Sequence, residues 1–197
     1  AAHTHHPVVL RRLEVARVAD VSPRCRRVTV TGAEVGPFHR DGLDLTGFRT
    51  ESPDDHVKVF LTADGADAPV LPRQADGHLD LSGSERPIAR DYTVRRFDPA
   101  AGEIDLDIIL HEEGPGSDWA RTVRPGDAVH LAGPRASHHL PRSGSLLLVG
   151  DHTALPAIAR WVEEVEPGTD VVAVVSVPDD GERLELAVPP GTTVDLH

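Results

Sequence analysis

Near the middle of the chain runs Arg90-Asp91-Tyr92-Thr93-Val94-Arg95-Arg96, a stretch whose aromatic and β-branched members favour a short β-strand. Turn-forming residues lie on both sides of it. Strict alternation along such a strand predicts that Arg90, Tyr92 and Val94 share one face. Thr93 and Arg95 then share the other face.

The same stretch gathers three chemical groups within four residues. A guanidinium such as that of Arg90 binds phosphate oxygens with two parallel hydrogen bonds. The phenol of Tyr92 packs on a flat ring, and the hydroxyl of Thr93 makes one directed hydrogen bond. These groups suit a ligand that contains a phosphate and a planar heterocycle. A plain strand with an exposed, ion-paired arginine is the alternative interpretation.

Working outward, the first two thirds of the chain favours antiparallel β-structure. Apolar and polar residues alternate in several short runs that turn-rich segments separate. With residues 90–97 these runs number about six, which indicates a closed or nearly closed β-barrel. The other predicted strands are residues 8–18, 26–31, 56–62, 104–110 and 128–132, with a short element near 43–45.

One helix is predicted within this barrel. The segment 111–116 is a glycine-containing turn, and residues 117–123 then have helical character, with Ser117 as the N-cap and Gly126 beyond the end. A turn of this kind before a helix lets backbone N–H groups approach an anion. The alternative is a plain capped connector that places Trp119 in the core.

The pattern changes after residues 141–144, which we interpret as a boundary between two domains, 1–142 and 145–197. Residues 145–150 form a continuous apolar run, typical of a strand buried on both faces. Residues 151–153 are expected to cap a helix, 171–177 to form a second strand, and 184–188 a possible third. Strand, helix and strand in this order predict a parallel α/β sheet, whose ligands bind beyond the carboxyl ends of the strands.

Composition limits the possible partners. The net charge of −12 makes nucleic acid an unfavourable ligand, although 18 of the 20 basic residues precede Ser145 and leave room for a local cationic site. No apolar run approaches the roughly 18–20 residues that span a bilayer. The single cysteine, Cys25, suits a reducing cytoplasm, which is the predicted location. The sequence does not indicate an oligomeric state.

Several motifs, taken in order, resemble the siderophore-interacting protein family, whose members include FAD-dependent ferric-siderophore reductases related to ferredoxin–NADP reductases. The resemblance covers roughly residues 8–177. The matching stretches are Arg90-Asp91-Tyr92-Thr93-Val94-Arg95, His111 with Gly114-Pro115 and Trp119-Ala120, Pro125-Gly126-Asp127, Gly133-Pro134-Arg135, and Gly150-Asp151-His152-Thr153-Ala154-Leu155-Pro156-Ala157.

This resemblance implies a flavin-binding barrel followed by a nucleotide-binding α/β domain. It implies that Arg90 contacts the FAD pyrophosphate, that Tyr92 packs on the isoalloxazine or ribityl chain, and that Thr93 bonds near flavin N5. The remaining cofactor-binding residues that it implies are Val94, His111, Gly114, Pro115, Ser117, Trp119 and Ala120 from the barrel, and Gly150, Asp151, Thr153 and Ala154 facing the flavin and an incoming nicotinamide nucleotide.

The implied reaction passes electrons from NAD(P)H, or another donor, through FAD to a ferric siderophore and releases ferrous iron. Only 53 residues follow Gly144, whereas a nucleotide-binding domain needs about 100. We therefore expect that this domain is incomplete. The alternative function is a FAD-binding module, or a repurposed biosynthetic flavoprotein, that lacks direct NAD(P)H oxidation.

A third interpretation is metal binding through the histidines of the N-terminal segment and of the pair His138-His139. The N-terminal candidates are His3, His5 and His6. Adjacent histidines lack the spacing that closes a tetrahedral site, so mobile surface residues are the competing interpretation.

Overall fold

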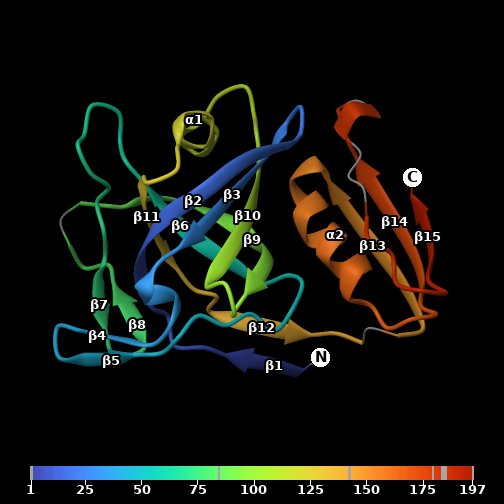
Figure 1. Ribbon diagram of the computed structural model, residues 1–197, viewed down its shortest axis with the longest axis horizontal. Coiled ribbons are helices and arrows are strands. Elements are labelled where there is room, and N and C mark those ends of the chain that lie inside the picture. Colours follow the sequence, from blue (N-terminus) through green and yellow to red (C-terminus); the bar gives the residue numbers. More distant parts are fainter. Residues whose placement is uncertain (1, 84, 142, 179, 183–185, 197) are drawn as a thin grey trace.

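The computed structural model describes residues 2–83, 85–141, 143–178, 180–182 and 186–196. Within these residues, six antiparallel strands close a barrel in the order β10-β3-β2-β11-β6-β9 (Figure 1). The predicted barrel is confirmed. Its strands are β2 (Leu10–Ser22), β3 (Cys25–Thr31), β6 (His56–Leu61), β9 (Ile88–Asp98), β10 (Glu103–Ile109) and β11 (Ala128–Ala132).

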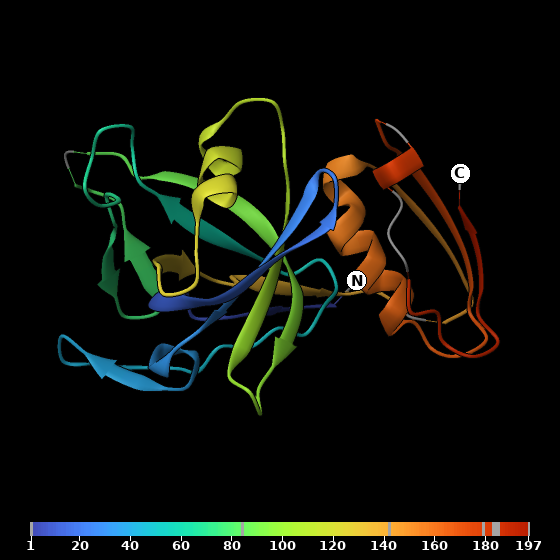
Figure 2. The same ribbon diagram turned by 45° about the horizontal axis from the view of Figure 1, so that its top comes forward.

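Short elements decorate the barrel. Three two-stranded sheets are described: β1 (Ala2–His5) with β12 (Ala136–His139), β4 (Phe38–Arg40) with β5 (Leu43–Leu45), and β7 (Arg73–Ala75) with β8 (His78–Asp80). A 3₁₀ turn, η1 (Ala33–Val35), follows β3. Helix α1 (Pro115–Thr122) lies over one end of the barrel, where Ala120 and the following Val123 join the apolar core (Figure 2).

The barrel interior is filled by alternate residues of every strand, as the sequence pattern requires. Val28, Val59 and Leu106 are examples with no solvent exposure. In β9, however, the alternation is broken by a bulge, because Arg96 pairs with Asp105 while Val94 pairs with Leu106. The extra residue is Arg95. Val94 and Phe97 consequently both pack on the core, an arrangement that strict alternation excludes.

The second unit is a parallel sheet, as predicted, with the strand order β13-β14-β15. Its elements are β13 (Ser145–Asp151), η2 (His152–Ala154), α2 (Leu155–Glu164), β14 (Asp170–Ser176), η3 (Asp180–Glu182) and β15 (Thr193–Leu196). The predicted strand at 184–188 falls partly outside the described residues. Its described part, 186–188, is not a strand, and β15 takes the third position.

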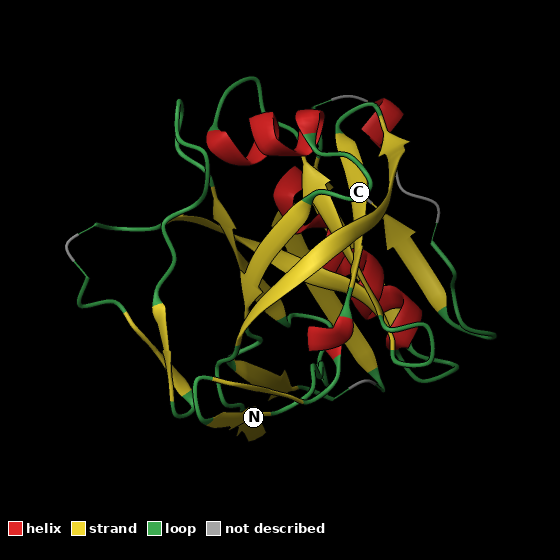
Figure 3. Cartoon of the chain, turned by 60° about the vertical axis from the view of Figure 1, so that its left-hand side comes forward, coloured by secondary structure: helices red, strands yellow, loops and turns green. Residues whose placement is uncertain are grey.

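The prediction that residues 145–150 are buried on both faces is wrong. Leu146 and Leu148 pack toward α2, but Leu147 and Val149 are 68% and 69% exposed. A continuous apolar run is typical of a strand whose two faces are both covered, whereas only one face of this sheet is covered among the described residues. Figure 3 shows the strands of the barrel and of the sheet together with the helices, coloured by secondary structure.

Helix α2 lies between the barrel and the parallel sheet (Figures 1 and 2). Its apolar side, which includes Val162, packs on β13 and β14 as the helical spacing predicts. Its other side is held to the barrel by polar contacts. Trp161 Nε1 donates to Asp54 Oδ1 at 2.8 Å, and Arg160 Nη1 donates to the carbonyl of Val94 at 2.9 Å. Both α2 side chains are buried.

Candidate functional site

A cleft of about 370 Å³ opens where β9 and β10 meet the turn before α1. It draws its lining from the barrel and also from the start of the second unit. The lining residues are Arg90, Asp91, Tyr92, Thr93, Asp107, Ile109, His111, Glu113, Gly114, Pro115, Gly116, Ser117, Thr153 and Pro156. We call this space the first cleft. Four consecutive β9 residues line it, so it wraps around the strand instead of lying on one face.

Tyr92 and Arg90 stand together in this cleft. The Tyr92 ring packs against the barrel core, with the Trp119 ring behind it at 6.4 Å between centroids. Burial raises the pKa of the Tyr92 phenol to about 12, although the Arg90 charge opposes that shift. The phenol therefore stays protonated at neutral pH. Arg90 is exposed and donates from Nη1 to the carbonyl of Ala89 at 2.8 Å.

Gly116 allows the turn to approach Tyr92 closely. A Cβ atom built at Gly116 would lie 2.1 Å from the Tyr92 hydroxyl oxygen and 3.5 Å from Arg90 Cγ. Any side chain at this position would push the phenol out of place. The absence of a side chain therefore lets the first turn of α1 lie directly against the two β9 residues.

Ser117 is not the N-cap that the sequence indicated. The N-cap is Gly114, and Pro115 occupies the first helical position, where its missing N–H is not needed. The Ser117 hydroxyl instead accepts a hydrogen bond from the His111 backbone N–H at 2.8 Å and ties the turn to the end of β10. Arg121 adds a second tie by donating to the His111 carbonyl.

The first turn of α1 faces the cleft at Gly116 and Ser117. The opening N–H groups of a helix have no acceptor within the helix, and the helix dipole favours an anion beside them. With the guanidinium of Arg90, the phenol of Tyr92 and the hydroxyl of Thr93, the cleft offers a donor set that fits a phosphate-linked planar heterocycle such as FAD.

Three of the site residues predicted in the barrel lie away from the first cleft. Val94 and Ala120 are fully buried in the barrel core. The backbone of Val94 is also engaged, since its N–H donates to Asp55 and its carbonyl accepts from Arg160. Trp119 lines a separate groove with β6 and β11 residues and supports Tyr92 from behind.

Of the four predicted residues in the second unit, only Thr153 lines the first cleft. Asp151 accepts hydrogen bonds from the Thr153 hydroxyl at 2.6 Å and from its backbone N–H at 2.9 Å, and these bonds hold the Asp151 pKa below its usual range. This is the predicted cap, made on η2. A Cβ at Gly150 would lie 2.6 Å from the Cβ of Ala154, so these two residues serve close packing.

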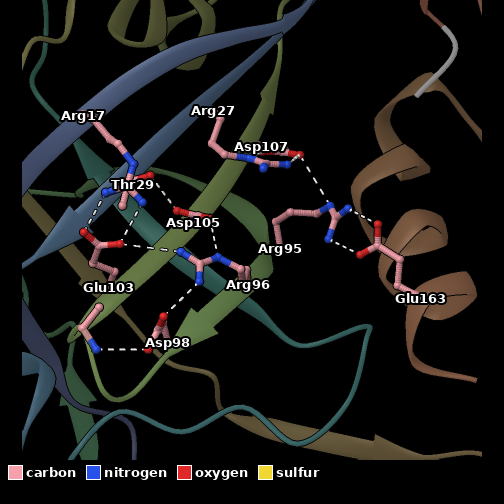
Figure 4. Close-up of polar contacts among 11 residues, drawn as sticks. Arg17, Arg27, Thr29, Arg95, Arg96, Asp98, Glu103, Asp105, Asp107 and Glu163 are labelled. Carbon is pink, nitrogen blue, oxygen red and sulfur yellow. Dashed lines mark hydrogen bonds and ion pairs between the residues drawn. The ribbon is translucent and has the colours of Figure 1, made fainter. Parts of the chain in front are cut away.

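The sequence analysis missed Asp107, a carboxylate at the wall of the cleft with a fully buried side chain. Arg27 holds it with two hydrogen bonds of 2.6 and 2.8 Å, and Arg95 Nε lies 3.6 Å away (Figure 4). Arg95 in turn makes two 2.6 Å bonds to Glu163 of α2. The chain of charges Asp107–Arg95–Glu163 therefore connects the cleft wall to α2.

A neighbouring network lies on the outside of the barrel (Figure 4). Arg96 Nε donates to Asp105 at 2.8 Å, and the Thr29 hydroxyl donates to the same carboxylate at 2.6 Å. Arg17 makes two bonds to Glu103. The bulge at Arg95 makes both networks possible, because it leaves Arg95 and Arg96 both outside the core, where one reaches α2 and the other the barrel wall. Strict alternation would place Arg96 on the same face as Val94, so the sequence pattern did not indicate these networks.

A second cleft, of about 500 Å³, lies on the other side of Asp91, which lines both. Its lining residues are His3, His5, Val8, His56, Lys58, Leu79, Asp91, Ala132, Gly133, Arg135, Ala136 and His138. Lys58 Nζ lies 2.7 Å from Asp91 Oδ1. His56 pairs with Thr93 in the β6–β9 ladder, so the two clefts are one strand apart.

The metal-binding interpretation of the histidines finds no support in the described part of the chain. Within the described ranges, no group of three or more His, Cys, Asp or Glu side chains is placed to hold a metal ion. Cys25 is buried, and desolvation raises the pKa of its thiol to about 12, which favours the neutral thiol. No helix among the described residues is long and apolar enough to cross a bilayer.

Comparison with known families gives two matches. The model described as the siderophore-interacting FAD-binding domain matches residues 14–138, and the model described as siderophore-interacting protein matches residues 144–197.

Named relatives are similar along most of the chain. A ferric vibriobactin reductase of Vibrio cholerae is 30% identical over 190 residues, and an NADPH-dependent ferric-chelate reductase of Escherichia coli is 33% identical over 183 residues. These matches cover 91% and 90% of this chain. The chain spans only 63% and 66% of the lengths of these relatives.

Among solved structures, a siderophore utilization protein from T. fusca superposes with a TM-score of 0.87 at 34% identity. The superposition covers 99% of this chain and 71% of that one. The siderophore-interacting protein SipS of Aeromonas hydrophila follows, with a TM-score of 0.72 at 31% identity, covering 98% and 71% of the two chains.

Proposed function

This chain belongs to the siderophore-interacting protein family, and from that premise we propose that it binds FAD in the first cleft and serves in a flavin-dependent ferric-siderophore reductase. In this reaction FAD would carry electrons from NAD(P)H, or another donor, to a ferric siderophore, and iron would leave as Fe²⁺. Hard oxygen ligands hold Fe²⁺ less tightly than Fe³⁺, which is why reduction frees the metal. The reductases named among the relatives support this reaction class.

One observation carries the proposal. A single cleft is lined by Arg90, Tyr92 and Thr93 of β9 and, farther along the chain, by residues of the turn 111–117. In our proposal the Arg90 guanidinium and the first-turn N–H groups of α1 bind the pyrophosphate of FAD. Tyr92 packs on the flavin ring, held in place by Trp119 behind it and Gly116 beside it. FAD, when bound, supplies the redox chemistry.

Thr93 is proposed to orient the flavin by a hydrogen bond near N5, the atom that receives hydride. Its backbone position is set by the β6–β9 ladder, where it lies opposite His56. A hydroxyl held on a strand keeps its direction better than one on a loop, because the strand fixes its backbone. No classical acid–base residue is required of this chain.

The donor is proposed to approach from the second unit. Thr153 and Pro156 bring η2 and α2 to the edge of the first cleft, beyond the carboxyl end of β13. This is where ligands of parallel sheets bind. Gly150, Asp151 and Ala154 are proposed to shape this edge by packing and capping. We also propose residues 1–142 and 145–197 as the two domains, with the second completed by further sequence in the relatives.

The acceptor is proposed to bind in the second cleft. Its cationic groups, Lys58 and Arg135, suit the negative charge that ferric tris-catecholate and polycarboxylate chelates carry. Asp91 lies between this cleft and the first, so the acceptor would be next to the flavin-binding strand. A cytoplasmic location is part of the proposal, and the buried, reduced Cys25 is compatible with it.

The test begins with the purified chain, with FAD added where needed. The proposal expects a yellow protein whose flavin is bleached anaerobically by NADH or NADPH and is reoxidised by a ferric siderophore, with Fe²⁺ captured by a ferrous-specific dye. A protein that remains colourless with excess FAD contradicts the proposal. Bound flavin that neither nucleotide bleaches would support the alternative, a FAD-binding module without direct NAD(P)H oxidation.

A further inference from the structure

Four imidazoles surround the second cleft. His3 and His5 project from β1, His138 from β12 and His56 from β6, and all four are exposed. His3 and His138 are direct partners in the β1–β12 ladder, with ring centroids 6.0 Å apart. The His3 and His5 rings meet edge to face at 4.7 Å. The paired strands β1 and β12, about 130 residues apart in sequence, lie at the bottom of Figure 1 and carry three of these four histidines. We call the four side chains the histidine rim.

The fixed charges of this cleft give it only a small positive potential. Lys58 and Arg135 are cationic, and Asp91 is the carboxylate among the described lining residues. One net positive charge therefore remains when the imidazoles are neutral. Because imidazole changes its charge between about pH 5 and 8, protonation of four histidines would raise this to five.

We propose that these four histidines make the second cleft a proton-dependent anion site, which selects multiply negative metal chelates and binds them more tightly as the pH falls. The inference rests on the proposed function, because it specifies the acceptor site. It adds the part played by the four histidines and a dependence on protons, neither of which the family resemblance contains.

Other charged and titratable groups lie around the rim. Their carboxylates offset its positive charge, but protonation of the imidazoles still adds positive charge to the cleft as the pH falls. On β12, His139 is turned toward Glu51, at 3.6 Å, and the preceding Ser137 is buried against His6 at 2.8 Å. His56 Nδ1 donates to the backbone carbonyl of Asp54 at 3.2 Å. The charged and titratable groups on or next to the elements that line the cleft include His3, His5, His6, Glu51, Asp54, Asp55, His56, Lys58, Arg73, His78, Asp80, Arg90, Asp91, His130, Arg135, His138 and His139.

The sign of the effect follows from proton linkage. If an anion binds the protonated rim better than the neutral rim, then binding takes up protons, and affinity rises as the pH falls through the imidazole range. Each exposed imidazolium contributes modestly because water and salt screen it. Together the four should make binding about tenfold tighter at pH 5.5 than at pH 8.0, at low ionic strength.

The test uses hexacyanocobaltate(III), a trianion whose charge is constant across this pH range and which resists reduction. Its dissociation constant is measured calorimetrically on the FAD-loaded protein between pH 5.5 and 8.0 at constant ionic strength. The triple variant His3→Gln, His5→Gln and His138→Gln should keep the pH 8.0 affinity and lose most of the pH dependence. The control variant His39→Gln changes an exposed histidine that pairs with Asp44 and does not line the cleft. It should retain the pH dependence.

Lys58→Met provides the second comparison, and it should weaken binding at every pH without flattening the pH dependence. Circular dichroism confirms that each variant is folded. Equal pH dependence in the triple variant and in the His39→Gln control overturns the proposal, as does the absence of anion binding at any pH. Flavin content and bleaching by NAD(P)H, recorded on the same samples, report separately on the proposed function.

Discussion

The barrel and the parallel sheet differ in how completely each buries its apolar surface. In the barrel, every strand pairs on both sides and the interior residues are closed off from water. In the sheet, α2 covers one face, whereas Leu147, Val149, Val172 and Val174 on the other face are 39–69% exposed. Parallel sheets are normally covered on both faces. The barrel therefore closes its own core off from water, whereas the sheet leaves one apolar face open among the described residues.

The barrel and the second unit also differ in their proposed contributions to FAD binding. The groups proposed to hold FAD, including Arg90, Tyr92 and Thr93, belong to the self-contained barrel. The second unit contributes only an edge, at Thr153 and Pro156. Its position relative to the cleft depends on polar contacts of α2, chiefly those of Arg160, Trp161 and Glu163. Five changes test how far the comparison holds, in decreasing order of expected effect.

Leu106→Ala should destabilise the protein by about 2–5 kcal/mol, because it opens a cavity in the closed barrel core. The matched change in the sheet, Leu147→Ala, removes the same atoms from a side chain that is 68% exposed. It should change stability by less than about 0.5 kcal/mol. Urea unfolding measures both, and similar losses in the two variants would mean that the sheet face is covered in solution.

Arg90→Ala should weaken FAD binding by about 1.5–3 kcal/mol, since it removes a charge-assisted bond to a phosphate. Thr153→Val, on the sheet side of the cleft, should change the FAD dissociation constant less than about threefold. Flavin fluorescence titration compares the two. An unchanged affinity in Arg90→Ala would remove this residue from the site.

Arg95→Met should cost about 1–3 kcal/mol of stability and loosen α2, because Glu163 and the buried Asp107 both lose a cation. Methionine keeps much of the apolar stem. Arg26→Met breaks an exposed pair with Asp20, whose side chain is 72% exposed, and should cost less than about 1 kcal/mol. Thermal unfolding and proteolysis after residue 144 compare the two variants. Equal losses of stability would mean that ion pairs do not hold α2 to the barrel.

Gly116→Ala should weaken FAD binding about tenfold, or about 1.4 kcal/mol, because the added methyl group displaces the Tyr92 phenol. Gly150→Ala crowds Ala154 in the second unit and should lower stability while leaving FAD affinity unchanged. Measuring both properties in both variants separates cleft geometry from packing. A normal FAD affinity in Gly116→Ala would show that Tyr92 can move without loss.

Thr93→Val should have the smallest effect on binding, about threefold, which lies near the lower end of the roughly 0.5–1.5 kcal/mol that one neutral hydrogen bond contributes. Its effect should appear in the rate of flavin reduction by NAD(P)H or in the flavin potential. Stopped-flow reduction of the loaded protein measures the rate. Kinetics and potential equal to those of the original protein would contradict the proposed contact near N5.

Local patterns in the sequence were sufficient to predict the barrel strands, the helix from Leu155 and the parallel order of β13 and β14. Alternation with period two and apolar spacing of three or four residues are properties of short segments. The groups at Arg90, Tyr92 and Thr93 could also be recognised, because the strand brings them together by itself. The roles assigned to these side chains remain predictions.

Only the tertiary structure decided which side of each strand or helix faces the core, the cleft or a neighbouring element. The bulge at Arg95 arises from pairing with β10, and it sends Arg95 to Glu163 and leaves Phe97 in the core. Asp107 became part of the cleft wall because Arg27 and Arg95 neutralise it, and the histidine rim exists because β1 pairs with β12. A single strand or helix specifies its own periodicity, but its partners are distant in sequence, and only packing determines them.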